Sequence, residues 1–153
     1  MPPSGYFIDA SLLVLLVVGS VGKELIEKHR RLREYSAEDY DILISLLDPV
    51  ARVYVTPNTL TETSNLLGQH ANPERSRFFD RLRFIIHESE EVVVTSAQAS
   101  SNSAFNRLGL TDAALLETVS PETPLVTVDL KLYLAAIASG QEAALNFTHY
   151  RNL

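Results

Sequence analysis

The stretch YFIDASLLVLLVV, residues 6–18, decides the fold class because it joins a short strand to an apolar helix through one acid, Asp9. Residues 6–9 carry the aromatic and branched side chains that are typical of a buried strand. The run from Leu12 to Val18 is apolar at every position. A helix that crosses a membrane needs about 20 such residues, so this shorter run predicts a helix buried in a protein core.

Four further strand-like runs follow, each short and apolar at nearly every position, which is typical of strands buried on both faces. They cover residues 52–56, 92–95, 125–129 and, more weakly, 144–147. Helical patterns separate them, and no tight hairpin turn joins any two, so we expect crossover connections. The sequence therefore predicts an α/β fold, a three-layer α/β/α sandwich around a mostly parallel sheet of about five strands.

The helices predicted between these strands follow the spacing of apolar residues. The first runs from residue 11 to about residue 33, with a break at Gly19 and Gly22. The others cover residues 37–47, 60–69, 74–86, 97–108, 113–119 and 130–138.

Composition fits one globular domain that spans residues 1–153. The chain has 46% apolar residues and no cysteine, which excludes disulfides, cysteine-based zinc sites and thiol nucleophiles. No basic residue precedes the first apolar run, so a signal peptide is not expected. These features favour a cytoplasmic protein with no membrane partner. The net charge of -6 argues against a broad nucleic-acid surface, so any such binding has to be local.

Four acids occupy related places in the predicted fold. Asp9 and Asp129 end the first and fourth strands, Glu62 lies in the helix after the second strand, and Asp112 opens the helix that leads to the fourth. In an open parallel sheet, the carboxyl ends of the strands and the starts of the following helices share one edge, where ligands bind. We therefore expect the four carboxylates to meet.

Each acid also has a simpler interpretation at a helix start. Asp9 and Asp129 can cap the helices that follow them, and Asp112 suits a first helical turn, where the helix dipole favours negative charge. Glu62 fits a capping box with Thr59, three residues before it. Both interpretations remain open for each acid when it is considered alone.

Considered together, the acids favour a cation site. Four crowded carboxylates raise one another's pKa unless a cation neutralises them. Oxygen ligands without cysteine favour Mg²⁺ or Mn²⁺ over Zn²⁺. The four histidines are scattered without ligand spacing, so we interpret them as surface or loop residues; they are His29, His70, His87 and His149.

The same residues make the chain resemble the PIN-domain family, in particular its toxin ribonucleases. The similar pieces are FIDAS, TPNTLTETSNLL, LGLTDAALLE, LVTVDLKLY and the closing ALNFTHYR, in that order. The resemblance implies a parallel sheet, a divalent-metal site at its edge and endoribonuclease activity. It assigns four catalytic acids, of which Asp9, Asp112 and Asp129 bind the metal and Glu62 is the fourth. It also implies that Thr127 supports the site by hydrogen bonding.

The resemblance further implies partners: an RNA substrate, a small antitoxin protein and a second copy of the chain in a homodimer. Two basic strips, residues 23–33 and 74–83, are either solvated helix faces or a track for RNA phosphates. The apolar run 12–18 and the group around Phe78 are interpreted as core, with a partner surface as the alternative.

Other functions remain as alternatives. The chain can be an RNA-processing nuclease that is not a toxin, or an interaction module that keeps the fold without catalysis. A phosphotransferase or phospho-receiver with Asp9 as nucleophile is disfavoured, because Ser11 stands where a dehalogenase-like enzyme has a second Asp and GYFID lacks an acid pair.

Overall fold

The fold is built on one five-stranded sheet, seen in a computed structural model that describes residues 3–47 and 52–151. Residues 1–2, 48–51 and 152–153 of the predicted domain lie outside the described residues. The strands are β1 Gly5–Ile8, β2 Arg52–Val55, β3 Glu90–Glu91, β4 Leu125–Thr127 and β5 Ala144–Asn146. Their order is β3-β2-β1-β4-β5, and all four pairings are parallel.

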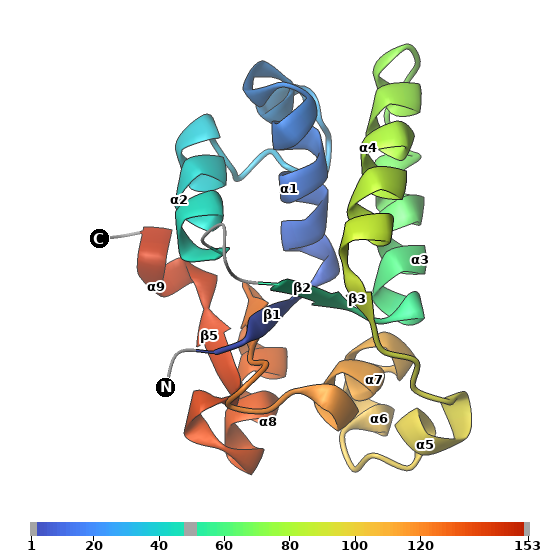
Figure 1. Cartoon of the computed structure of the whole chain (residues 1–153), viewed down its shortest axis with the longest axis vertical. Coiled ribbons are helices and arrows are strands. Elements are labelled where there is room, and N and C mark those ends of the chain that lie inside the picture. The colour runs from blue at the N-terminus through green and yellow to red at the C-terminus, as the bar shows by residue number, and fades with distance from the viewer. Residues whose placement is uncertain (1–2, 48–51, 152–153) are drawn as a thin grey trace.

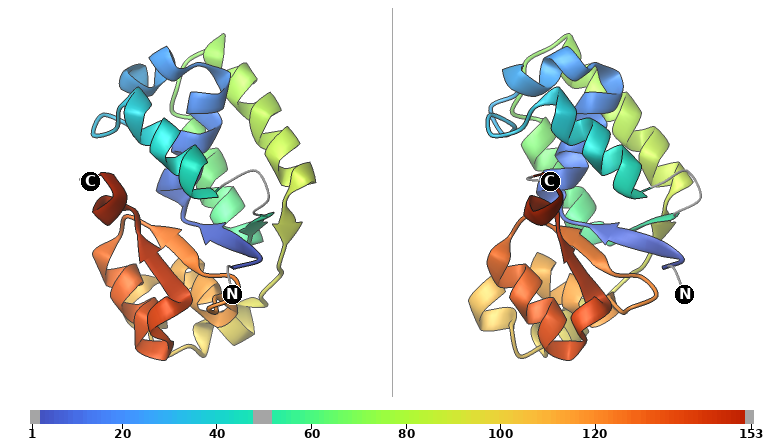
Figure 2. Two further views of the ribbon diagram at one scale, coloured as in Figure 1. Left: turned by 60° about the vertical axis from the view of Figure 1, so that its left-hand side comes forward. Right: turned by 90° about the vertical axis from the view of Figure 1, so that its left-hand side faces the viewer.

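Helices cover both faces of the sheet, which confirms the predicted three-layer α/β/α class (Figure 1). On one side lie α1 Ala10–Val21, the 3-10 helix η1 Lys23–Lys28, α2 Ala37–Leu47, α3 Pro57–Leu67 and α4 Glu74–Glu88. On the other side lie α5 Ser96–Ser100, α6 Phe105–Leu108, α7 Leu110–Thr118 and α8 Leu130–Ser139. The 3-10 helix η2 Gln141–Ala143 precedes β5, and α9 Phe147–Arg151 follows it and packs against α2 (Figure 2).

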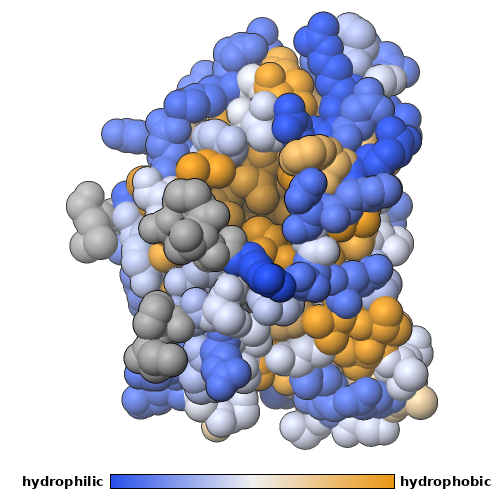
Figure 3. All heavy atoms as spheres, viewed as in Figure 1, coloured by the Kyte–Doolittle hydropathy of each residue, from blue (hydrophilic) through white to orange (hydrophobic). Residues whose placement is uncertain are grey.

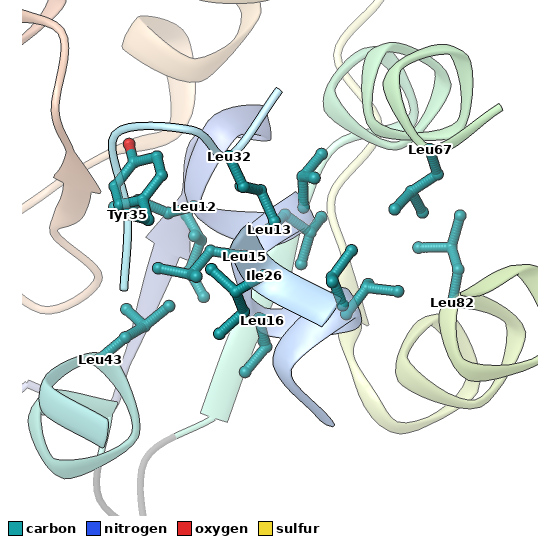
Figure 4. Packing of buried hydrophobic residues seen from close by; sticks show 14 of the residues in the cluster. Leu12, Leu13, Leu15, Leu16, Ile26, Leu32, Tyr35, Leu43, Leu67 and Leu82 are labelled. Atoms are coloured by element: carbon teal, nitrogen blue, oxygen red, sulfur yellow. The ribbon is translucent and has the colours of Figure 1, made fainter. Parts of the chain in front are cut away.

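The main core surrounds α1, and residues 12–18 are all buried as predicted. Figure 4 shows Leu43 of α2 on one side of this helix and Leu67 of α3 and Leu82 of α4 on the other. Because neighbours pack around it, α1 needs no polar face. A Cβ atom on Gly19 would lie 2.2 Å from the ring of Tyr40, so glycine lets α2 pack closely against α1.

Several predicted boundaries are wrong. The first helix ends at Val21 and not near residue 33; Gly22 follows it and donates its N–H to the Val18 carbonyl, whereas Gly19 stays inside the helix. The predicted helix 97–108 is two short helices, because the Asn102 side chain accepts the Ala104 N–H and stabilises a turn between them.

The predicted third strand, 92–95, is also misplaced. The paired residues are Glu90 and Glu91, which form a short edge strand, and only the Val92 N–H continues the ladder by bonding the Val55 carbonyl at 2.8 Å. Charged side chains on an edge strand discourage pairing with another chain. The valines after it leave the sheet, and the side chain of Val93 is 72% exposed.

His29 lies in a loop, as expected, but its side chain is not at the surface. This side chain is fully buried, and its ring stacks on that of His70 with centroids 5.2 Å apart. Burial, and secondarily the charge on His70, lowers the pKa of His29 to about 4. The backbone around His29 is a turn, but its imidazole belongs to the core beside Phe78. His87 and His149 are exposed, as expected.

The core interpretation of the Phe78 group is confirmed. Phe78 and Leu82 are buried, and Phe79, Ile85 and Ile86 are partly buried against the core around α1. Within the described part of the chain, no helix is both long enough and apolar enough to cross a membrane.

The strand order places a topological switch between β1 and β4. From β1 the chain moves outward to β2 and β3, then returns to β4 on the other side of β1 and continues to β5. When the connections from two adjacent strands run in opposite directions, a crevice opens at the carboxyl ends of those strands. This crevice is the usual ligand site of such sheets. Asp9 follows β1 directly, and Asp129 comes two residues after β4.

Candidate functional site

The four predicted acids surround one cavity of about 120 Å³ at this switch point. They come from four segments: the starts of α1 and α8, the middle of α3 and the first turn of α7. In Figure 1, α1 and α3 lie on one side of the sheet and α7 and α8 on the other. The remaining lining residues are Ala10, Ser11, Thr111, Leu115, Val128 and Leu132.

Asp9 is the most firmly held of the four acids. One carboxylate oxygen accepts the Leu12 N–H at 2.9 Å and caps α1. The other accepts the Val128 N–H at 3.1 Å and the hydroxyl of Thr127. Burial raises the pKa of Asp9, these hydrogen bonds oppose the rise, and the charge of Asp129 adds to it. Three donors from two segments therefore fix the direction of this carboxylate.

Thr127 connects the two strand ends. Its hydroxyl donates to Asp9 and accepts the Asp129 N–H at 3.0 Å, and the side chain is fully buried. Asp129 in turn accepts the Leu132 N–H at 3.1 Å and caps α8. The capping interpretation is therefore confirmed for Asp9 and Asp129, both of which also face the cavity.

Glu62 and Asp112 have no such structural role. The predicted capping box of Glu62 with Thr59 does not form, because α3 begins three residues earlier and Thr56 caps it by accepting the Thr59 N–H. Asp112 lies in the first turn of α7 as predicted, but that helix starts from Gly109, whose φ of 88° only glycine adopts readily. Within the described residues, neither carboxylate accepts a hydrogen bond.

The pKa of Asp112 reflects the crowding of acids in the cavity. Burial raises its pKa to about 6, and the charges of Asp129, Glu62 and Asp9 contribute in that order. This is the pattern expected where several carboxylates share a site. An acid that is half-buried among three others and has no partner is a candidate for a functional residue.

No family model matches the chain, and no curated protein matches it significantly. The resemblance to PIN domains therefore rests on the ordered sequence motifs and stays a prediction.

The chemistry of the donor set suits a hard divalent cation, because the described residues that line the cavity supply carboxylate oxygens and no positively charged side chain. Within residues 3–47 and 52–151, however, no three Asp, Glu or His side chains lie close enough around one point to hold a metal ion. Mg²⁺ usually keeps several waters and binds through one or two carboxylates. The cavity thus fits a hydrated ion, held partly through water, better than an ion fully ligated by protein.

Two features were not predicted from the sequence. Ser11 and Thr111 complete the wall of the acid cavity, and a larger cavity of about 550 Å³ adjoins it. The sequence signal for the second cavity is a polar stripe on α3, with Asn58, Thr61, Glu62 and Asn65 at helical spacing. Neither cavity is lined by a residue of the basic strips. The strip 23–33 follows the far end of α1, roughly 18 Å from Asp9 at 1.5 Å per residue. The strip 74–83 lies in α4, which packs beside α1.

Proposed function

We propose that the chain is a divalent-metal-dependent endoribonuclease that hydrolyses RNA phosphodiester bonds. The observation that carries this proposal is the convergence of Asp9, Glu62, Asp112 and Asp129 on one small cavity at the switch point of a parallel sheet. Phosphodiester hydrolysis by water needs charge neutralisation and an oriented nucleophile, and it needs no nucleophilic side chain. A set of carboxylates around a cation meets those needs.

The residues of the cavity have different roles in the proposed mechanism. Asp9, Asp112 and Asp129 would hold Mg²⁺ or Mn²⁺, directly or through water. The bound ion would supply positive charge that neutralises the carboxylates and stabilises negative charge developing on the phosphoryl oxygens. Thr127 keeps Asp9 aimed at the cavity by its hydrogen bond. Glu62, which lines both cavities, would accept a hydrogen bond from the attacking water and so orient it.

The biological role is a narrower part of the proposal. By resemblance we expect a toxin of a toxin-antitoxin pair, with a small antitoxin protein as partner and a homodimer as the functional form. An RNA-processing nuclease without a toxic role would use the same chemistry. An interaction module without catalysis would have no use for Asp112, whose raised pKa reflects an unfavourable environment for its charge.

The test is cleavage of labelled RNA by the purified protein with Mg²⁺, with Mn²⁺ or with excess chelator. We expect cleavage with either ion and none with chelator. Asp112→Asn should lower the rate about 100- to 1000-fold, the size of effect found when one charge-stabilising group is removed from an active site.

Asp80→Asn is the matched control. Asp80 is an exposed aspartate of α4 that pairs with Arg83 on the surface at 3.1 Å and lines neither of the two cavities described above. Its variant should cleave like the wild type. Equal cleavage with and without chelator, or equal losses in both variants, would contradict the proposed mechanism.

A further inference from the structure

The larger cavity shares a wall with the acid cavity. Glu62 and Thr111 line both, so the two cavities lie next to each other at these residues. The volumes differ: about 120 Å³ suits an ion and a small group, whereas about 550 Å³ is in the range that accommodates small organic ligands. The two cavities therefore suit different parts of one substrate.

Helix α3 gives the larger cavity one polar wall. Asn58, Thr61 and Asn65 follow one another at i, i+3 and i+7, so they lie on one face of the helix. Within the described residues their side chains make no hydrogen bond to the protein. The opposite face behaves differently, since Thr63 is buried and donates to the Thr59 carbonyl at 2.8 Å. The outer face is thus left with its hydrogen-bonding groups available to a ligand.

The facing wall adds an apolar surface. Val93 and Val94 come from the segment between β3 and α5, and Ser96 begins α5. Val93 is 72% exposed, and Figure 3 shows an apolar patch over this segment. A flat ring with polar edges would contact such a valine with its face and the amides of Asn58 and Asn65 with its edge.

The charge of the cavity excludes phosphate as its ligand. Among the described residues, its lining contains one carboxylate, Glu62, and no Lys or Arg. A phosphate there would be repelled, whereas an uncharged base or ribose would not. Side-chain amides pair with base edges because they donate and accept at once.

We propose that the larger cavity binds the nucleoside next to the scissile phosphate, with Asn58 and Asn65 reading the edge of an unpaired base that packs on Val93. This inference rests on the proposed nuclease function and names the substrate class as single-stranded or looped RNA. A base inside a duplex is stacked and paired, so its edge and face are not free to enter.

The experiment compares the wild type with the double variant Asn58→Ala, Asn65→Ala. Single-stranded RNA of randomised sequence is cleaved with Mg²⁺, and the base beside each cut is read by sequencing. We expect a base preference that falls by roughly 5- to 150-fold in the double variant, the cost of losing good amide contacts to a base. Asn106→Ala is the matched control, because Asn106 is an exposed asparagine of α6 outside both cavities. It should keep the wild-type preference.

A second measurement separates this inference from the nuclease function. Binding of the four free nucleosides, which carry no phosphate and need no metal, is followed by saturation-transfer NMR. If wild type cleaves RNA but the double variant keeps its base preference, the nucleoside site is overturned and the nuclease stands. If wild type binds a nucleoside but cleaves nothing, and the double variant loses that binding, the nuclease is overturned and the site stands. If wild type neither cleaves nor binds, both are overturned.

Discussion

The four acids of the cavity form two unlike pairs. Asp9 and Asp129 begin helices, and each accepts hydrogen bonds from the backbone. Glu62 and Asp112 begin no helix, and neither accepts a hydrogen bond within the described residues. All four carboxylates crowd one cavity, but the first pair also stabilises the fold through its hydrogen bonds, whereas the second makes none within the described residues. A carboxylate that costs stability and has no internal partner is best explained by a ligand.

The largest stability effect expected from this difference is that of Asp9→Ala. The variant removes the cap of α1 and leaves the Val128 N–H and the buried Thr127 hydroxyl without their acceptor. Loss of a cap costs about 1 kcal/mol, and each stranded buried donor costs about 1–3 kcal/mol. Removal of a buried charge offsets part of this. We expect the free energy of unfolding to fall by roughly 2–3 kcal/mol, measured by urea denaturation without metal.

Asp112→Ala is the matched control in the same assay. It removes a carboxylate from the same cavity without removing an acceptor, so we expect no loss of stability. Equal losses in the two variants would remove the distinction between the pairs.

The next effect tests whether one cation binds to carboxylates of both pairs. At an Mg²⁺ concentration ten times its dissociation constant, linkage stabilises the folded wild type by about 1.4 kcal/mol. The increase in melting temperature should be smaller in Asp112→Asn and unchanged in Asp80→Asn. Differential scanning fluorimetry over a series of Mg²⁺ concentrations measures it. Identical increases in all three proteins would place the bound ion away from the cavity.

The smallest effect is the pH dependence of the repulsion itself. The pKa of Asp112 is about 6 in the folded chain and near 3.8 when unfolded, so its protonated form favours folding. That contribution is complete below pH 4 and is lost as the pH rises through 6. Asp112→Asn suffers no such loss. After allowance for solvent screening, we expect the metal-free variant to be more stable than wild type by about 1 kcal/mol at pH 8.

The difference between the two proteins should vanish near pH 4. The titration of His29, whose pKa is lowered to about 4 by burial, is common to both proteins and cancels in this comparison. Urea denaturation at several pH values measures it. A variant that is less stable than wild type at pH 8 would show that Asp112 serves the start of α7.

The sequence predicted the fold class well because the apolar runs were unambiguous. Residues 12–18 lack any polar position, and helices with neighbours on several sides are the ones that permit this. The boundaries were less predictable. The valines at 92–94 have strong strand propensity, yet the pairing residues are Glu90 and Glu91, because an edge strand needs only a few hydrogen bonds from one side.

For the site, order along the chain was enough to predict that the acids meet, because parallel strands place their carboxyl ends at one edge. It was not enough to separate the two pairs. Whether Glu62 caps α3 depends on where that helix begins, and Pro57 with Thr56 starts it one turn earlier than the apolar pattern indicated. Burial of His29 arises from its contact with His70, far along the chain, which no local pattern reveals.

The hydrogen bonds of Asp9 and Asp129 bear on which of the four acids evolution would keep. Natural selection for folding alone would retain both residues, since each begins a helix. It would not retain Glu62 or Asp112, which the fold does not need. In relatives that have lost the proposed nuclease activity, we expect positions 62 and 112 to be substituted first, while the two capping aspartates remain. Under the proposed nuclease function, the acids on α3 and α7 are therefore the ones whose presence would distinguish an active relative from an inactive one.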